Sequence, residues 1–568
     1  MIGLISATSA GQRGCEHLAA AWPDEVRVYD GPVREAVGRA FAECEQLVCF
    51  LATGAVVRLI APLLRGKDTD PGVVTVDETH QHAIALLGGH GGGANELAQR
   101  VADALGCRPV ISTATDAAGV PGLDMLGWPV DGAVAAVSRA ILDGDPVHLD
   151  TPHGVHPLPA LPPNVTAATD SDVSLIVTDR VAAADTAART VLLRPPSLVV
   201  GVGGSRGVPA DEVLTLIGSA LADAGLSPRS VVALATVDAK ADEAGIVEAA
   251  ERLGVPLLTY TADRLAGIDV PNPSDAPLAA VGTPSVAEAA ALAAAPGGEL
   301  LVPKRKSAPQ EGPAMATAAV ARRRPRGRLS VVGLGPGARD LLTPRAREEL
   351  RRASVIVGLD QYVDQIRDLL RPGTRILESG LGAEEERART AVEQARAGHA
   401  VALIGSGDAG VYAMASPALA AAADDIDVVG VPGVTAALAA AAILGAPLGH
   451  DHVSISLSDL HTPWDVIERR VRAAAESDLI VTFYNPRSRG RDWQLPKALS
   501  LLAEHREPGT PVGVVHAASR PDERSEVTTI AALDVTTVDM VTVVTVGNTA
   551  TRNVAGRMVT PRGYRWQA

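Results

Sequence analysis

The stretch VVGLGPGARDLLTPRAREELRRA, residues 331–353, decides how the second half of the chain folds. Gly333, Gly335 and Ala338 follow an apolar run with the G-x-G-x-x-G/A spacing of a dinucleotide-binding loop, and Asp360 ends the next apolar run. In that motif the glycines open a helix, so that the helix N-terminus meets a pyrophosphate. The position of the next helix therefore tests the interpretation.

That helix begins too late. Thr343 is the expected N-cap and Pro344 the expected first helical residue, followed by the helix body RAREELRRA. The glycines lie in a loop several residues before this start, which is a poor geometry for a pyrophosphate. The spacing therefore disfavours a nicotinamide oxidoreductase.

Buried-strand runs alternate with Ala-rich helical stretches along the whole chain. Examples are SLVVGVG (197–203), AVALIGSG (400–407) and DLIVTFYN (478–485). This alternation predicts α/β layers with largely parallel sheets. The 568 residues suggest several domains, and with 2% aromatic residues the cores must be built from Ala, Val and Leu.

Charge and composition exclude several classes of function. A net charge of −15 argues against a general nucleic-acid binder. The N-terminus has no basic residue before its short apolar run, and no uncharged apolar stretch is long enough to span a bilayer. We therefore expect a soluble, cytoplasmic protein that does not bind membranes. The four cysteines form no C-x-x-C pair, so we expect buried free thiols and no metal site.

Domain boundaries are marked by two irregular stretches. KRKSAPQEGPAMATAAVARRRPRGR, residues 304–328, is basic and contains three prolines, which favours an exposed linker over a nucleic-acid-binding tail. A second, proline-rich stretch begins near residue 145. The expected segments are 1–145, a middle segment 146–196, an α/β domain 197–306, a linker 307–327, and two further domains 328–440 and 441–568.

Three more glycine loops follow strands in the second half. They are GSGDAGVYAMAS (405–416), VVGVPGVTAALAAA (428–441) and FYNPRSRGRDWQL (483–495). Together with GLGPGARDLLT they resemble the tetrapyrrole (class III) S-adenosylmethionine methyltransferases, and within them the precorrin-3B carbon-17 methyltransferases of cobalamin biosynthesis. The resemblance covers residues 328 to the end. It implies two αβα domains that meet near residue 440, with S-adenosyl-L-methionine in the cleft between them.

The resemblance also implies which residues contact each ligand. The activity would methylate carbon 17 of a tetrapyrrole and contract the macrocycle. The implied cofactor residues are Gly335, Pro336, Gly337, Gly407, Asp408, Val411, Tyr412, Pro432, Gly433, Thr435, Ala436, Tyr484 and Asn485. Asp408 is alternatively a turn cap.

The tetrapyrrole carries many carboxylates. Arg487, Arg489 and Arg491 are the predicted contacts to them, because arginine pairs with carboxylates in two hydrogen bonds. The alternative for these three residues is a solvated loop with surface ion pairs. The chain departs from the family at Ala517 and Ala518, where related enzymes have an asparagine-containing turn.

The first half contains GGHGGGAN, residues 88–95, directly before a predicted helix. Bare backbone amides near a helix start favour an anion, and His90 could act as an acid or base, or be purely structural. This stretch, with VVGVGGSRGVPADEV (199–213), resembles the cobalt-precorrin-5A hydrolases over residues 1–306. That family opens a lactone and releases acetaldehyde.

Lactone opening needs an activated water and a stabilised oxyanion. We predict His90 as the base and Asp116 as its orienting partner, with loop amides as oxyanion donors. This chain has Gly88 where the family has serine, which speaks against a serine-assisted mechanism. Lys240 and Glu243 are further polar candidates, for which a helix surface is the favoured placement.

The sequence thus predicts a multidomain α/β chain that fuses a cobalamin-pathway, hydrolase-like half to a two-domain αβα class III methyltransferase. In the alternative function, the first half only binds or hands over tetrapyrroles, and the methyltransferase alone is active. The expected partners are the tetrapyrrole substrate, other cobalamin-pathway enzymes and a second copy in a homodimer. Whether cobalt is already present in the substrate stays open.

Overall fold

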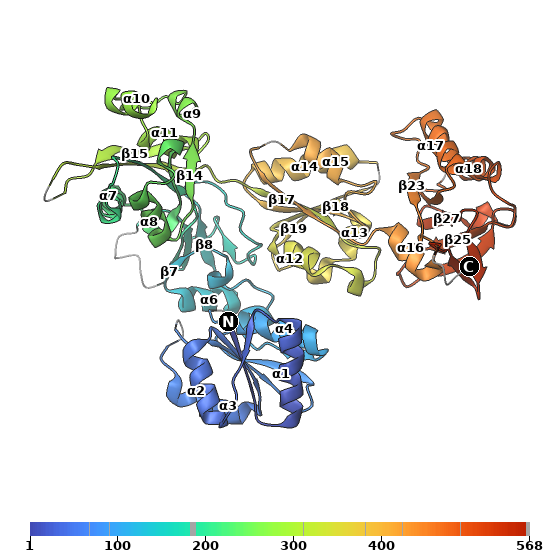
Figure 1. Cartoon of the computed structure of the whole chain (residues 1–568), viewed down its shortest axis with the longest axis horizontal. Helices are drawn as coiled ribbons and strands as arrows, with labels where there is room; N and C mark the ends of the chain where they lie inside the picture. Colours follow the sequence, from blue (N-terminus) through green and yellow to red (C-terminus); the bar gives the residue numbers. More distant parts are fainter. Residues whose placement is uncertain are drawn as a thin grey trace. The chain divides into compact units, whose positions relative to one another are not determined.

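The computed structural model of the chain describes residues 1–66, 69–89, 91–181, 189–309, 312–380, 382–422, 424–488 and 490–563. These residues form two compact units. The first contains residues 1–154, 161–325 and 371–373, and the second contains 155–160, 326–370 and 374–568. Figure 1 shows α/β layers throughout both units, as the alternation of strands and helices predicts.

The first sheet of the first unit has the strand order β2-β1-β3-β4-β5-β6. Helices α1 and α4 cover one face and α2 and α3 the other (Figure 1). The strands are β1 (Ile2–Ser6), β2 (Val26–Val28), β3 (Gln46–Phe50), β4 (Gly72–Val76), β5 (His82–Leu87) and β6 (Arg108–Val110). The helices are α1 (Ser9–Ala21), α2 (Val33–Glu43), α3 (Thr53–Ile60) and α4 (Ala94–Leu105). Cys15, Cys44 and Cys49 are free and buried in this layer, as expected, whereas the free Cys107 is only partly buried.

The second sheet is small and lies in the middle of the first unit's sequence. Its order is β7-β11-β10-β8-β9, flanked by the helix α6 (Val134–Asp143). The strands are β7 (Val130–Gly132), β8 (Val147–Asp150), β9 (Val165–Thr166), β10 (Ser174–Val177) and β11 (Thr190–Leu193).

The third sheet corrects the expected linker. Its order is β14-β13-β12-β16-β15, with β12 (Leu198–Gly204), β13 (Val231–Val237), β14 (Leu257–Tyr260), β15 (Glu299–Lys306) and β16 (Ala316–Arg322). Residues 316–322 are therefore an interior strand, not part of an exposed linker over 307–327. Five of its residues, Ala316 and Ala318 to Ala321, are buried. Its core side chains are only Ala and Val. The arginines and prolines on either side therefore made the sequence pattern look like that of a linker.

The fourth sheet opens the second unit, and all its strand pairs are parallel. Its order is β19-β18-β20-β17-β21, with β17 (Arg328–Gly333), β18 (Val355–Leu359), β19 (Arg375–Ser379), β20 (Ala400–Gly405) and β21 (Asp427–Val431). Helices α12 (Pro344–Arg352) and α13 (Asp360–Asp364) cover one face, and α14 (Glu384–Arg396) and α15 (Ala415–Ala421) the other (Figure 1). Because the strands are parallel, their carboxyl ends and the glycine loops after them share one edge of the sheet.

The predicted helix start is confirmed. The Thr343 hydroxyl accepts a hydrogen bond from the backbone N–H of Ala346 at 3.1 Å, and α12 begins at Pro344. Glu349 of this helix is buried and receives a hydrogen bond from Arg328 at 2.6 Å and another from the Ser330 hydroxyl. These bonds fasten α12 to the first strand of the sheet.

The last part of the chain follows α16 (Ala436–Leu444), close to the expected boundary at 440. Its main sheet, β23-β24-β27-β25-β26, is mostly antiparallel. The strands are β23 (His452–Ser456), β24 (Ile480–Tyr484), β25 (Pro511–His516), β26 (Arg524–Thr529) and β27 (Thr542–Val546), and helices α17 (Trp464–Glu476) and α18 (Gln494–Ala503) pack on them. A small sheet joins β22 (Gly445–Ala446), β28 (Arg552–Val554) and β29 (Arg557–Val559).

Candidate functional site

Three glycine loops meet at the carboxyl edge of the fourth sheet. Gly335 and Gly407 exchange two backbone hydrogen bonds, of 3.0 and 2.7 Å. A Cβ added to Gly433 would lie 2.1 Å from the carbonyl oxygen of Gly407, and one added to Gly333 would lie 2.7 Å from the same oxygen. Such contacts are closer than any side chain allows, so the loops pack backbone against backbone.

Asp408 joins two of these loops. One carboxylate oxygen accepts from the backbone N–H of Gly410 at 2.8 Å, and the other from that of Gly433 at 3.0 Å. Both bonds go to backbone donors of the protein itself, as the turn-cap alternative describes. Asp408 therefore fixes the separation of the loop after β20 and the loop after β21.

Tyr484, at the end of β24, connects the last part of the chain to the glycine loops. Its hydroxyl lies 2.5 Å from the Thr435 hydroxyl and accepts from the backbone N–H of Ala437 at 2.9 Å. The rings of Tyr412 and Tyr484 lie 5.3 Å apart, and the Tyr412 hydroxyl donates to the carbonyl oxygen of Ser454 at 2.7 Å. Tyr412 has a positive φ of 52°, an uncommon conformation for a side chain of this size. The predicted cofactor residues thus form one connected group.

The remaining predicted cofactor residues lie on the same loops. Pro336 follows Gly335, Val411 hydrogen-bonds to the Asp408 carbonyl, Pro432 follows β21, and Ala436 opens α16. Asn485 has a φ of 49° and donates to the Ser456 hydroxyl at 3.1 Å. Two of the thirteen predicted residues, Tyr412 and Asn485, line the cavity described next.

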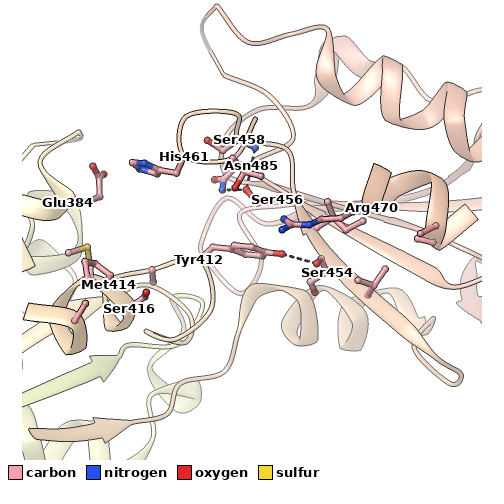
Figure 2. A pocket seen from close by; sticks show the side chains of 18 of the residues that line it. Glu384, Tyr412, Met414, Ser416, Ser454, Ser456, Ser458, His461, Arg470 and Asn485 are labelled. Atoms are coloured by element: carbon pink, nitrogen blue, oxygen red, sulfur yellow. Dashed lines mark hydrogen bonds between the residues drawn. The ribbon is translucent and has the colours of Figure 1, made fainter. Parts of the chain in front are cut away.

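A cavity of about 920 Å³ lies beside this group. Figure 2 shows Glu384, Met414 and Ser416 on one side and Ser454 and Ser458 on the other, with Tyr412 between them. Four of its charged or titratable side chains, Glu384, Glu385, His461 and Arg470, were not predicted from the sequence. The cavity therefore offers hydroxyl groups, the guanidinium group of Arg470, the imidazole of His461 and the carboxylates of Glu384 and Glu385.

The predicted arginines bind the protein's own backbone. Arg487 donates to the carbonyl oxygen of Val535 at 3.0 Å, and Arg491 to that of Asn485 at 2.5 Å. Burial lowers the pKa of the Arg491 guanidinium, and the nearby charge of Asp459 opposes this shift. Both side chains hold the loop after β24 in place. Neither belongs to the described residues that line the cavity of about 920 Å³. Arg489 lies outside the described residues.

Arg520 is another residue that sequence reasoning missed. Its Nε donates to the carbonyl oxygen of Pro336 at 2.9 Å, and its Nη2 to the Ser406 hydroxyl at 3.3 Å. It follows the turn of Ala517 and Ser519, both of positive φ, where the chain departs from the family pattern. Through Arg520, this turn is bonded to the loop after β17 and to the loop after β20, although it contains no asparagine.

In the first unit, Asp116 lies next to the glycine loop of residues 88–93. Its carboxylate accepts from Asn95 Nδ2 at 2.8 Å and from the Thr113 hydroxyl at 2.6 Å. A Cβ added to Gly89 would lie 2.9 Å from Asn95 Oδ1, which places the loop against this cluster. His90 lies outside the described residues, so its predicted pairing with Asp116 stays a prediction.

Lys240 and Glu243 are not on an exposed helix surface. They pair at 3.1 Å in the turn between β13 and α8 (Ala244–Leu253), with side chains 17% and 10% exposed. Glu243 also accepts from the backbone N–H of Gly207 at 2.7 Å. The pair holds the loop after β12.

In the part of the chain that the structure describes, no helix is long and apolar enough to cross a membrane, and no three metal-ligating side chains cluster.

Three family models match the chain. The model described as Cobalamin synthesis G N-terminal matches residues 35–116, and that described as Cobalamin synthesis G C-terminus matches 198–321. The model of the Tetrapyrrole (Corrin/Porphyrin) Methylases matches residues 328–534. The C-terminus model extends into β16, up to residue 321, in agreement with the third sheet.

Curated relatives match the second half. A protein of Salmonella typhimurium named probable cobalt-factor III C(17)-methyltransferase is 47% identical over 239 residues, which are 42% of this chain and 99% of that protein. A precorrin-3B C(17)-methyltransferase of Sinorhizobium sp. is 41% identical over a stretch that is 42% of this chain and 97% of that protein. A cobalt-factor III methyltransferase of Priestia megaterium is 41% identical over 42% of this chain. The matched stretch is only 46% of the Priestia protein. The crystal structure of the methyltransferase CobJ matches 41% of this chain and 100% of its own, with 40% identity and a TM-score of 0.40.

Proposed function

Since the chain belongs to the tetrapyrrole (corrin/porphyrin) methylase family, we propose that its second unit transfers a methyl group from S-adenosyl-L-methionine to carbon 17 of a precorrin-3B-type macrocycle, with ring contraction. The chain also carries both cobalamin synthesis G domains, which support a role in cobalamin biosynthesis for the first unit as well. The observation that carries the proposal is the position of Tyr412. It packs on Tyr484 in the predicted cofactor group and also lines the large cavity.

The glycine loops fit S-adenosyl-L-methionine. They present backbone with no side chain at Gly335, Gly407 and Gly433, so that a ligand can approach the main chain closely. The Thr435 and Tyr484 hydroxyls and the Tyr412 ring supply polar and stacking partners for a nucleoside. When bound, the cofactor supplies a methyl group already activated by its sulfonium.

The contribution of the protein is therefore geometry. Asp408, Tyr484 and Arg520 hold the loops at fixed separations through hydrogen bonds to backbone or hydroxyl groups. Positioning of two reactants in this way can be worth roughly 7–11 kcal/mol. No charged side chain is required at the carbon that accepts the methyl group.

The cavity of about 920 Å³ is the proposed site of the macrocycle. Its volume lies near the top of the range for small-molecule sites. Arg470 is exposed and lines it, so this side chain, rather than Arg487 or Arg491, is the proposed partner of a substrate carboxylate. His461 and the serines around it would hydrogen-bond to further carboxylates.

For the first unit we propose lactone opening with release of acetaldehyde. His90 would take a proton from the attacking water, and Asp116 would orient His90, because the Asp116 cluster packs on the same glycine loop. The test is acetaldehyde release from cobalt-precorrin-5A by the full chain. A His90→Gln variant should lose it, whereas acetaldehyde release at the wild-type rate would contradict the role of His90.

The methyltransferase proposal is tested by incubating the full chain with S-adenosyl-L-methionine and either precorrin-3B or its cobalt form. The printed names of the relatives include both substrates, so both are assayed. We expect a product heavier by one methyl group with one of them. Binding of S-adenosyl-L-methionine without any methylated product would contradict the choice of substrate.

A further inference from the structure

In the first unit, a threonine hydroxyl lies in a setting typical of a nucleophile. Thr113 is in the loop after β6, and its Oγ1 donates a hydrogen bond to Asp116 Oδ2 at 2.6 Å. Asn95 Nδ2 donates to Thr113 Oγ1 at 2.8 Å and to Asp116 Oδ2 at 2.8 Å. The three side chains therefore form a closed triangle of a hydroxyl, a carboxylate that accepts its hydrogen, and an amide that orients both. A nucleophile, a base and a group that orients the base are the arrangement that covalent hydrolysis requires.

The first sheet assembles this triangle. β5 and β6 pair in parallel, so the loops that follow them lie at the same edge of the sheet. Asn95 comes from the first turn of α4, directly after the glycine loop that follows β5. Thr113 and Asp116 come from the loop after β6 and the short helix α5 (Ala114–Ala117). Asn95 lies 18 residues before Thr113, so the folded sheet, rather than local sequence, makes the contact.

The bonds of Thr113 are not those of an ordinary helix cap. Thr113 occupies the N-cap of α5, where a threonine oxygen commonly accepts a bond from a backbone N–H of the first turn. Its side chain makes no such bond. The hydroxyl hydrogen points to the carboxylate of Asp116 instead, and the oxygen accepts from Asn95. The hydroxyl is thus arranged to give up a proton and not to close the helix end.

Glycine keeps the backbone of the neighbouring loop close to Thr113. A Cβ added to Gly89 would lie 3.0 Å from Thr113 Cγ2 and 2.9 Å from Asn95 Oδ1, which leaves no room for a side chain there. Thr113 is half-buried and Asp116 is exposed, so the triangle borders the solvent. The hydroxyl therefore lies at the surface of the unit beside bare main chain, whose N–H groups are the kind of donor that stabilises an oxyanion.

We propose that Thr113 is the nucleophile of lactone opening, an inference that rests on the lactone-opening function proposed above. Thr113 Oγ1 bonds to the lactone carbonyl carbon while its proton passes to Asp116. The ring C–O bond then breaks, and the leaving oxygen takes the proton from Asp116. The product of this first step is an ester on Thr113 that still carries every atom of the substrate.

Water ends the cycle by hydrolysing this ester. Its oxygen bonds to the ester carbonyl carbon while one of its protons passes to His90, the base proposed above. The bond between that carbon and Thr113 Oγ1 breaks, and Oγ1 receives the proton from His90. One water is consumed for each lactone opened, and Thr113 is restored.

The test is mass spectrometry of the full chain, quenched in acid after mixing with cobalt-precorrin-5A. His90→Gln removes the base of the second step, so the ester should accumulate. We expect this variant to gain the mass of the whole substrate, or of the substrate less acetaldehyde, on the peptide that contains Thr113. The double variant His90→Gln and Thr113→Val should gain no mass on that peptide.

Acetaldehyde release by single variants supplies the second readout. Thr113→Val should lower the rate about a hundredfold or more, whereas Thr113→Ser keeps a hydroxyl and should retain most of it. Thr79→Val is the matched control and should keep the wild-type rate. Thr79 donates a hydrogen bond of the same length, 2.6 Å, to Asp77 in the turn between β4 and β5.

The outcomes separate this inference from the function on which it rests. No adduct on the Thr113 peptide of His90→Gln would overturn the covalent step, and so would acetaldehyde release by Thr113→Val at the wild-type rate. A wild-type chain that releases no acetaldehyde would overturn the lactone-opening function and this inference with it.

Discussion

The Asp408 carboxylate accepts a hydrogen bond from the backbone N–H of Gly433 at 3.0 Å and so ties the loop after β20 to the loop after β21. The bond joins residues 25 positions apart across the carboxyl edge of the fourth sheet. It keeps these two backbone segments at a fixed separation.

Asp408→Asn should weaken binding of S-adenosyl-L-methionine about tenfold or more. A hydrogen bond to a charged group is worth about 1.5–3 kcal/mol, and each 1.4 kcal/mol is tenfold in affinity. Isothermal titration calorimetry measures the dissociation constant. Asp427→Asn is the matched control. Asp427 is the first residue of β21, at the end of the strand opposite the loop that holds Gly433, and it pairs with Arg326 on the surface. Equal affinities of the two variants would contradict the role of Asp408.

Gly433→Ala should abolish cofactor binding and lower thermal stability. Its Cβ would lie 2.1 Å from the Gly407 carbonyl oxygen, and overpacking of this kind costs about 1–3 kcal/mol or more. Gly430→Ala is the control: Gly430 lies on β21, just before the loop that holds Gly433, and apart from its own chain neighbours no described heavy atom lies within 4 Å of its Cβ position. The measurement is differential scanning calorimetry with and without S-adenosyl-L-methionine. An equal rise of the melting temperature with ligand in both variants would show that the close packing at Gly433 is not needed for binding.

Arg470→Gln should raise the KM for the tetrapyrrole about tenfold and leave the cofactor affinity unchanged, because it removes the proposed carboxylate contact. Arg469→Gln, its exposed neighbour on α17, is the control. Steady-state kinetics of methyl transfer supply both constants. Unchanged KM in Arg470→Gln would remove this residue from the substrate site.

Arg487→Ala separates the two interpretations of the predicted arginines. Its bond to the Val535 carbonyl predicts a lower melting temperature with little change in KM. Calorimetric melting and steady-state kinetics of the same variant measure both quantities. A tenfold rise in KM at unchanged stability would instead favour a substrate contact for Arg487.

Stability of the second unit should depend on pH through Glu349. Burial alone would raise the pKa of this carboxyl, but hydrogen bonds from Arg328 and Ser330 outweigh it and lower the pKa below its usual value. The ionised form therefore stabilises the fold above pH 4.5, and this contribution is lost as the pH falls through the lowered pKa.

Glu349→Gln checks this dependence. The variant should cost about 3 kcal/mol at pH 7, the scale for breaking a buried ion pair, and much less once wild-type Glu349 is protonated. Calorimetric melting of the full chain, in a series from pH 7 downward, measures how this difference changes. A wild-type-minus-variant difference that does not shrink at low pH would contradict it.

The sequence predicts the glycine loops well because each depends on local signals. Thr343 before Pro344 marks a helix start, and a run such as AVALI followed by glycines marks the end of a buried strand. Parallel pairing then brings the loops together. These signals, read with the family resemblance, were enough to name the residues that form one connected group around Tyr484.

The features that the sequence did not predict depend on contacts between residues far apart in the chain. Arg520 contacts the Pro336 carbonyl from 184 residues away, and nothing in its own neighbourhood signals that bond. Arg470 lies on an amphipathic helix where an arginine is typical of a solvated face. β16 was missed because its core residues are Ala and Val, and prolines and arginines flank them. Its pairing with β12 and β15 exists only in the folded sheet and leaves no local signal.

We propose that the second unit places a cofactor methyl group on carbon 17 of the macrocycle. The most direct measurement uses S-adenosyl-L-methionine with a CD₃ group and the full chain, with precorrin-3B and its cobalt form in parallel. Mass spectrometry shows whether one CD₃ is gained, and NMR locates it. We expect a single CD₃ at carbon 17 of a ring-contracted product, lost in Gly433→Ala and kept in Gly430→Ala. A CD₃ group at another carbon, or none with either substrate, would contradict the claim.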